Sequence, residues 1–326
     1  MKARTHASFS RRSFLQHATG LAALVLPGIG VPHVAQAAPS LLRVATDVLD
    51  VAYLASGPVD GRPVVLVHDF SYGIDSFSRA ASLLAAAKLR VLAPQLRGHG
   101  GTRFHDAAAP RSGEQAALGK DLIDFIDALH IPEAVFAGFG WGAHAAYAAS
   151  LVRPTRCVGL VLAGIERIDE AGPRERYLYA SDAGRQVLDR DRRALARETW
   201  RRLSPRGPFE AALFAQVAPA FDHPDYAAVL AHAWLGRHAP LDPLAAPDPR
   251  YAALEMKFFG PGTAVPALSL SGGASGVVTA PGAGIEFRGR HAQRVLAGVG
   301  HHLPFEAPRA FAEAVLELVH AGTWRT

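Results

Sequence analysis

The chain has 326 residues, of which 49% are apolar and 19% charged, and its formal net charge is +5. This length is enough for one large core or two modest domains. Four of the 34 basic residues and no acidic residue lie in the first 37 positions, so the rest of the chain carries a net charge of +1. The sequence contains no basic face with interleaved aromatic residues, which argues against a nucleic-acid partner.

The first 37 residues have the pattern of an export signal. The stretch "SRRSFLQ" at 10–16 resembles the twin-arginine consensus, and "GLAALVLPGIGV" and "AQAA" follow it. Pro27, Gly28 and Gly30 interrupt the apolar stretch, which disfavours a stable membrane span. We therefore expect a twin-arginine signal peptide at 1–37, cleaved near Ala37. The twin-arginine export machinery is then a partner, and the mature protein is periplasmic or secreted.

Cys157 is the single cysteine, so no internal disulfide can form. It lies in the apolar run "CVGLVLAGI" and is expected to be a small buried hydrophobic residue rather than a nucleophile.

After the leader, short β-rich runs alternate with longer Ala- and Leu-rich runs. Strands are expected at 41–46, 49–56, 62–70, 90–96, 133–139, 156–165, 265–273 and 291–302. Helices are expected at 76–89, 112–131, 141–152 and 308–322, and Ser112 and Gln115 have the spacing of a capping box. Continuous apolar strands separated by helices predict an α/β fold with a mostly parallel sheet covered on both faces.

This alternation stops between residues 166 and 263, where no convincing strand is found and Arg, Ala and aromatic residues dominate. The predicted organisation is a core formed by 38–165 and 264–326, with an inserted helical cap at 166–263.

Four motifs lie in a characteristic order. They are "VHDF" at 67–70, "LRGHGGTRF" at 96–104, "GFGWGAHAA" at 138–146 and "GVGHHLPFEAP" at 298–308. Over essentially the whole mature chain, this set resembles the α/β-hydrolase superfamily, in particular epoxide hydrolases and haloalkane or haloacetate dehalogenases. Trp141 after the glycine turn favours this group over serine esterases.

The resemblance implies a catalytic plan that this chain departs from. In that family an aspartate attacks carbon to form an ester, and a histidine oriented by a second carboxylate activates water to hydrolyse it. The nucleophile position is Gly140, which has no side chain. The usual acid position holds Ala274 and Ser275, and Glu166 is the nearest alternative, with Asp169 and Glu170 beyond it.

His301 matches the catalytic histidine, with its neighbour His302 as the fallback. Phe70 and Trp141 match the oxyanion-loop positions, but Asp69 stands where glycine is usual. A carboxylate there would oppose a developing oxyanion. Asp69 is therefore either a solvent-facing turn residue or a displaced carboxylate that acts with His301.

The cap and the remaining histidines suggest further candidates. Tyr177 and Tyr179 occupy the stretch where epoxide hydrolases carry oxygen-polarising tyrosines, although ordinary amphipathic packing is the favoured explanation for them. Trp200 and Trp234 are candidates to line or stabilise the cap. His68, His144 and His301 have no short ligand spacing, so neither a metal nor a cofactor is expected.

Two functions follow from these departures. The first is an exported homologue without covalent hydrolase activity that binds a small apolar molecule or retains a vestigial pocket. The second is an active hydrolase of an epoxide, ester or lactone in which His301, with Asp69 or Glu166, activates water.

Overall fold

The computed structural model describes residues 41–165, 173–207, 209–277 and 285–322. Residues 39–326 form one compact unit. Across the described ranges, no helix combines the length and the apolar character that crossing a bilayer requires.

A mostly parallel sheet forms the centre of this unit. Its order is β1-β2-β4-β3-β6-β7-β8-β9, and β5 pairs with β2. The pairings of β2 with β1, β4 and β5 are antiparallel, and all others are parallel. The strands are β1 (Leu42–Ala45), β2 (Leu49–Ser56), β3 (Pro63–Val67), β4 (Arg90–Pro94), β5 (Arg103–Phe104), β6 (Ala134–Phe139), β7 (Cys157–Ala163), β8 (Ala267–Gly272) and β9 (His291–Leu296).

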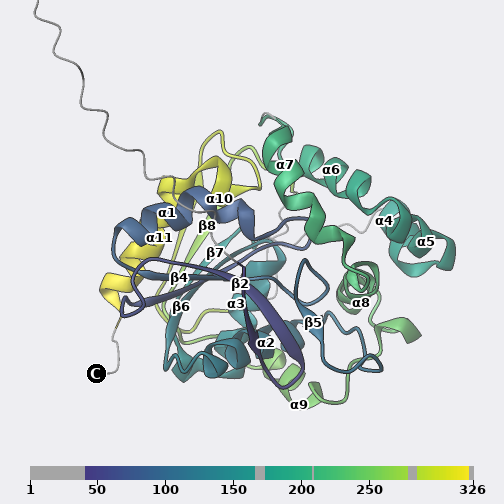
Figure 1. The fold of residues 1–326 in the computed structure, drawn as a ribbon, viewed down its shortest axis with the longest axis horizontal. Helices are drawn as coiled ribbons and strands as arrows, with labels where there is room; N and C mark the ends of the chain where they lie inside the picture. Colours follow the sequence, from purple (N-terminus) through teal and green to yellow (C-terminus); the bar gives the residue numbers. More distant parts are fainter. Residues whose placement is uncertain (1–40, 166–172, 208, 278–284, 323–326) are drawn as a thin grey trace, which may run out of the picture. The chain divides into compact units, whose positions relative to one another are not determined.

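Helices cover both faces of the sheet, because its central strands are apolar on both sides. Figure 1 shows α1 and α11 together on one face and α2 and α3 on the other, and both pairs are in direct contact. These helices are α1 (Ser78–Ala86), α2 (Gln115–Ala128), α3 (Trp141–Val152) and α11 (Pro308–Ala321), with the short α10 (Leu303–Glu306) before the last. Cys157 is buried at the start of β7, as the sequence predicts.

The described part of the insertion contains helices and no strand. Figure 1 shows α4 to α8 grouped to one side of the sheet. They are α4 (Pro173–Ala180), α5 (Asp182–Arg190), α6 (Arg192–Leu203), α7 (Ala211–Val217) and α8 (Tyr226–His238), followed by α9 (Ala252–Glu255). Short 3-10 turns are η1 (Ile74–Phe77), η2 (Pro154–Arg156), η3 (Ala218–Asp222), η4 (Pro243–Ala245) and η5 (Met256–Phe259).

One local expectation was wrong. Helix α2 begins at Gln115, and its N-cap residue Glu114 makes no side-chain capping bond. The hydroxyl of Ser112 instead accepts a hydrogen bond from the buried Arg97 guanidinium at 2.8 Å. A buried arginine must be hydrogen-bonded to several acceptors, and Ser112 serves as one of them instead of capping the helix.

The parallel topology determines where the motifs meet. The carboxyl ends of β3, β6, β7, β8 and β9 lie at one edge of the sheet. The loops that follow these strands carry Asp69, Gly140, Gly164, Ala274 and His301 respectively. Ligands of open α/β sheets bind at this edge.

Candidate functional site

Gly140 forms a sharp turn between β6 and α3. Its backbone has φ +54° and ψ −125°, a conformation that side-chain-bearing residues rarely adopt. This is the geometry of the nucleophile turn that the motif "GFGWG" predicts. The turn has therefore kept its shape without the side chain that it normally presents.

The side chain of Asp69 fills the space above this turn. A Cβ atom built on Gly140 would lie 2.4 Å from both Cγ and Oδ2 of Asp69. Asp69 is only 6% exposed, so it is not a solvent-facing turn residue. Its carboxylate, supplied by the loop after β3, thus occupies the volume that a residue at the turn would take.

Two backbone amides hold one oxygen of this carboxylate. The N–H groups of Phe70 and Trp141 donate to Oδ1 of Asp69 at 2.7 and 3.1 Å. These are the oxyanion-loop positions that the sequence identifies. Oδ1 of Asp69 thus occupies both amide donors, and the expectation that a carboxylate here would oppose a separate oxyanion stays a prediction.

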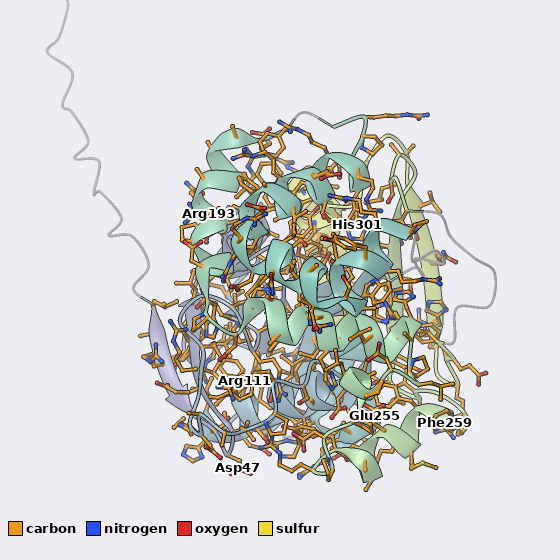
Figure 2. All side chains as sticks on the ribbon, turned by 90° about the vertical axis from the view of Figure 1, so that its right-hand side faces the viewer. Asp47, Arg111, Arg193, Glu255, Phe259 and His301 are labelled. Atoms are coloured by element: carbon orange, nitrogen blue, oxygen red, sulfur yellow. The ribbon has the colours of Figure 1, made fainter. Side chains whose placement is uncertain are left out.

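The second oxygen of Asp69 faces His301. Oδ2 lies 3.4 Å from His301 Nε2, and the histidine is 2% exposed. Figure 2 shows His301 within the outline of the protein, whereas Phe259, which is 84% exposed, lies at its edge. The structure therefore brings together two of the candidate catalytic residues, in a setting shielded from bulk water.

The opposite side of the His301 ring is different. Nδ1 is buried and has no hydrogen-bond partner among the described residues. A Cβ atom on Gly164 would lie 3.0 Å from Nδ1, so Gly164 lies close to this side of the ring. The amide of Ala274 donates to the carbonyl of Val299 at 2.8 Å, and position 274 carries no carboxylate. Glu166 lies outside the described residues, and its role stays a prediction.

His302 is packed among aromatic rings. Its ring stacks on Phe139 and lies 4.5 Å from the Tyr72 ring and 5.0 Å from the Trp200 ring, measured between centroids. Burial, followed by the charge of His301, lowers the pKa of His302 well below its usual value. His301, and not the fallback His302, contacts the Asp69 carboxylate.

Buried partners fix the loop that carries Asp69. His68 contacts the carbonyl of Asp69 through Nδ1 at 2.8 Å, and its Nε2 accepts from the amide of Leu96 at 3.1 Å. Burial, followed by the charge of His99, lowers the pKa of His68 to about 3, so this ring is neutral. The indole N–H of Trp200 in α6 donates to the carbonyl of Ser71 at 2.6 Å, which links the cap to the same loop.

The three histidines considered for a metal have other partners. His68 bonds backbone groups, the ring of His144 contacts the Arg237 guanidinium, and His301 faces Asp69. In the described ranges, no three His, Cys, Asp or Glu side chains gather in a group that could hold a metal ion.

A cavity of about 90 Å³ adjoins Asp69 beneath the cap, and we call it the Asp69 cavity. Its lining comprises Asp69, Phe70, Ser71, Trp141, Glu175, Tyr179, Thr199, Arg202, Leu203, Leu230, Trp234, Arg237 and His238. A cavity of about 150 Å³ accommodates benzene, so this volume suits a molecule of a few heavy atoms. A larger cavity of about 550 Å³ is lined by other residues of α6, including Trp200 and Arg201, and lacks Asp69.

The structure separates the two cap tyrosines. Tyr179 lines the Asp69 cavity, and burial raises its pKa to about 12, so its hydroxyl remains a proton donor at neutral pH. Tyr177 is 48% exposed and lines a surface hollow with Pro173 and Ala180. Residues two apart on a helix point in different directions, so only one of the pair reaches the cavity. Trp234 lines the cavity, whereas Trp200 packs beside it.

Charged cap residues contribute to the cavity, and sequence reasoning missed them. Arg202 lies 3.8 Å from Glu175, and Arg237 stacks on the Trp141 ring with its guanidinium carbon 4.7 Å from the centroid. The lining is thus more polar than the apolar pocket suggested by the sequence. Many arginines in the cap look alike in sequence, and only the helix packing distinguishes the two that face inward.

Comparison with known proteins is consistent with this geometry. The profile of the alpha/beta hydrolase family matches residues 64–314. The crystal structure of a candidate epoxide hydrolase from Klebsiella pneumoniae is 31% identical with a TM-score of 0.79, covering 86% of this chain and 97% of that one.

Two curated epoxide hydrolases match over shorter stretches. Epoxide hydrolase 3 from Siraitia grosvenorii is 32% identical over 120 residues, which is 37% of this chain and 36% of the relative. An epoxide hydrolase from Caballeronia sordidicola is 35% identical over 96 residues, which is 29% of each protein. The chain thus spans about a third of the length of these relatives. It belongs to the alpha/beta hydrolase family and is similar to the epoxide hydrolases within it.

Proposed function

We propose that the protein is a hydrolase of small epoxides in which Asp69 and His301 are the working pair. The observation that carries this proposal is the position of the Asp69 carboxylate, 3.4 Å from His301 Nε2 and in the volume above Gly140. A buried carboxylate that lines a cavity, with a buried histidine beside it, supplies the groups that ester and epoxide hydrolysis require.

The Asp69 cavity supplies the remaining groups for this reaction. The Tyr179 hydroxyl can donate a proton to the epoxide oxygen as the ring opens, because its raised pKa keeps it protonated. The volume of about 90 Å³ selects molecules such as propylene oxide or glycidol over bulky aryl epoxides. Arg202 and Arg237 favour substrates that carry a polar or anionic substituent.

The test is an assay of diol formation from propylene oxide and glycidol, with the purified wild-type protein beside Asp69→Asn and His301→Ala. We expect turnover in the wild type and loss of turnover in both variants. Equal rates in all three proteins would contradict the proposal.

A second candidate function is binding without chemistry. It is favoured by the His301 Nδ1 atom, which lacks a carboxylate partner among the described residues. A histidine base without an orienting acid is a weaker catalyst. Under this alternative, small epoxides or diols bind to the wild type with measurable heat in calorimetry, but no diol forms.

We also propose that the protein is exported by the twin-arginine pathway. The paired Arg11 and Arg12 and the sequence up to Ala37 support this. Fractionation of cells expressing the full chain, beside an Arg11→Lys/Arg12→Lys variant, tests it. We expect the wild type in the periplasm or medium and the variant in the cytoplasm, and an equal distribution of the two would contradict export by this route.

A further inference from the structure

We infer that Asp69 is a transposed nucleophile, whose Oδ2 atom forms the covalent ester with substrate although it lies on a different loop from the usual nucleophile. This inference rests on the proposed function and specifies its chemical step. It differs from direct activation of water by the pair, the role that the sequence suggests for Asp69.

The first argument is positional. A side chain on Gly140 would begin 2.4 Å from the Asp69 carboxylate, so the two positions compete for one volume. The residue after β3 reaches this volume without backbone strain, because Asp69 is not among the described residues with positive φ. An aspartate at position 140 would have to adopt φ near +54°. The carboxylate is thus retained in space and lost only from the usual place in the chain.

The two carboxylate oxygens of Asp69 have different contacts. Oδ1 accepts from the amides of Phe70 and Trp141, and Oδ2 faces His301. An ester formed through Oδ2 leaves Oδ1 as the carbonyl oxygen between two amide donors. These donors would then stabilise the negative charge that develops on Oδ1 when water attacks the ester.

The contacts of the His301 ring favour a nucleophilic role of Asp69 over a purely orienting one. A carboxylate that orients a catalytic histidine leaves the other ring nitrogen free to act as the base. Asp69 faces Nε2, so this role would make Nδ1 the base. Nδ1 is buried, has no hydrogen-bond partner among the described residues and lies close to Gly164. Nε2 is the ring nitrogen that faces Oδ2 of Asp69, so it is the nitrogen placed to activate water for attack on an ester at that oxygen.

The reaction has two stages, which are opening of the epoxide ring and hydrolysis of the ester. Oδ2 attacks an epoxide carbon, the C–O bond breaks, and its electron pair goes to the epoxide oxygen, which takes a proton from Tyr179. His301 Nε2 then removes a proton from water, and the water oxygen attacks Cγ of Asp69. The tetrahedral intermediate expels the product oxygen, which takes the proton from His301. Asp69 is left as a carboxylic acid and releases its proton to solvent, while Tyr179 regains a proton from solvent. One epoxide and one water thus give one diol, and the enzyme returns to its starting form.

Two measurements test this mechanism. His301→Ala protein is incubated with propylene oxide and digested with trypsin, because removal of the base should let the ester accumulate. We expect a peptide heavier by the mass of the intact epoxide. Fragmentation must place the added mass on Asp69 and not on the other aspartates of the same peptide, which are Asp47, Asp50, Asp60 and Asp75. Asp69→Asn/His301→Ala is the matched control and should remain unmodified.

The second measurement is a single turnover of excess wild-type enzyme in H₂¹⁸O. We expect unlabelled diol and a gain of 2 Da on Asp69, since water attacks the enzyme ester. Labelled diol with unlabelled Asp69 would overturn the inference while leaving the proposed hydrolase function intact. Absence of both the ester and diol would overturn both, whereas the ester without diol would support the nucleophile and contradict hydrolysis.

Discussion

The two ring nitrogens of His301 have different surroundings. On the Nε2 side, Oδ2 of the Asp69 carboxylate faces the ring, and its other oxygen, Oδ1, is held by two amides. On the Nδ1 side, the described residues provide a glycine backbone and no carboxylate. Within the part of the chain that the structure describes, the carboxylate therefore lies on the Nε2 side of the ring and none lies on the Nδ1 side. Gly140 and Ala274 both lack a carboxylate, yet a carboxylate from another loop lies above Gly140 and none is seen beside Ala274 among the described residues.

The largest expected effect is on the Nε2 side. Asp69→Asn keeps the size of the side chain and removes its charge, so kcat for small epoxides should fall by at least about 10³-fold. Steady-state diol formation measures this. Asp75→Asn, which removes another carboxylate from η1, is the matched control and should retain activity. A fall in kcat of less than about 10-fold in Asp69→Asn would show that the carboxylate on the Nε2 side of His301 is not needed for the reaction.

Restoring the usual aspartate without removing the new one should be harmful. Gly140→Asp places Cβ within 2.4 Å of the Asp69 carboxylate and imposes a strained φ that costs about 1–3 kcal/mol. We expect lower stability in urea denaturation and about 100-fold lower activity. The double variant Asp69→Gly/Gly140→Asp relieves the clash and should recover activity relative to either single change. Higher activity in Gly140→Asp alone would show that the two positions do not share one volume.

Proton donation from the cap is the next effect. Tyr179→Phe removes the hydroxyl that lines the Asp69 cavity, and kcat should fall by about 10- to 100-fold. Tyr177→Phe is a matched control, because Tyr177 is 48% exposed and outside the cavity. Equal losses in the two variants would show that cap packing, and not proton donation, is responsible.

The Asp69 loop should also weaken in acid. The folded pKa of His68 is about 3, below the ordinary 6.5, so its neutral form stabilises the fold above pH 6.5. That stability is lost as pH falls from 6.5 towards 3. At pH 5 the loss is about 2 kcal/mol of unfolding free energy.

Urea denaturation at pH 7.5 and pH 5.0 tests this, with His68→Gln as the comparison. Glu114 changes the free energy of unfolding in the opposite direction, because burial raises its folded pKa to about 7 and its neutral form therefore stabilises the fold in acid. The two proteins are therefore compared in a Glu114→Gln background, which removes this contribution. A wild-type decrease no larger than that of His68→Gln would contradict the assignment.

The smallest expected effect concerns the Nδ1 side. Glu166→Gln should lower kcat by less than about 3-fold, because Asp69 is the carboxylate seen against His301. A loss above about 100-fold, measured with the same epoxides, would show that Glu166 supports the base. The contrast between the two ring sides would then disappear.

The sequence was sufficient for the fold, and it left the pairing of Asp69 with His301 as one of two alternatives. Apolar strands, the glycine turn and the motif order predict the sheet, the turn at Gly140 and the strand-end location of His301. The contact between Asp69 and His301 joins residues 232 positions apart and depends on the path of the loop after β3. The spacing of apolar residues along the sequence contains no information about the path of this loop. The inward position of Tyr179 and Arg237 likewise depends on how cap helices pack, which binary patterning leaves open.

The volume shared by Asp69 and Gly140 also constrains how such a site can change by mutation. A protein with both aspartates crowds two carboxylates into one space, and a protein with neither has no attacking group. Any route of single substitutions between the two arrangements passes through one of these forms. Each arrangement is therefore separated from the other by an impaired intermediate, which makes the choice of loop hard to reverse one residue at a time.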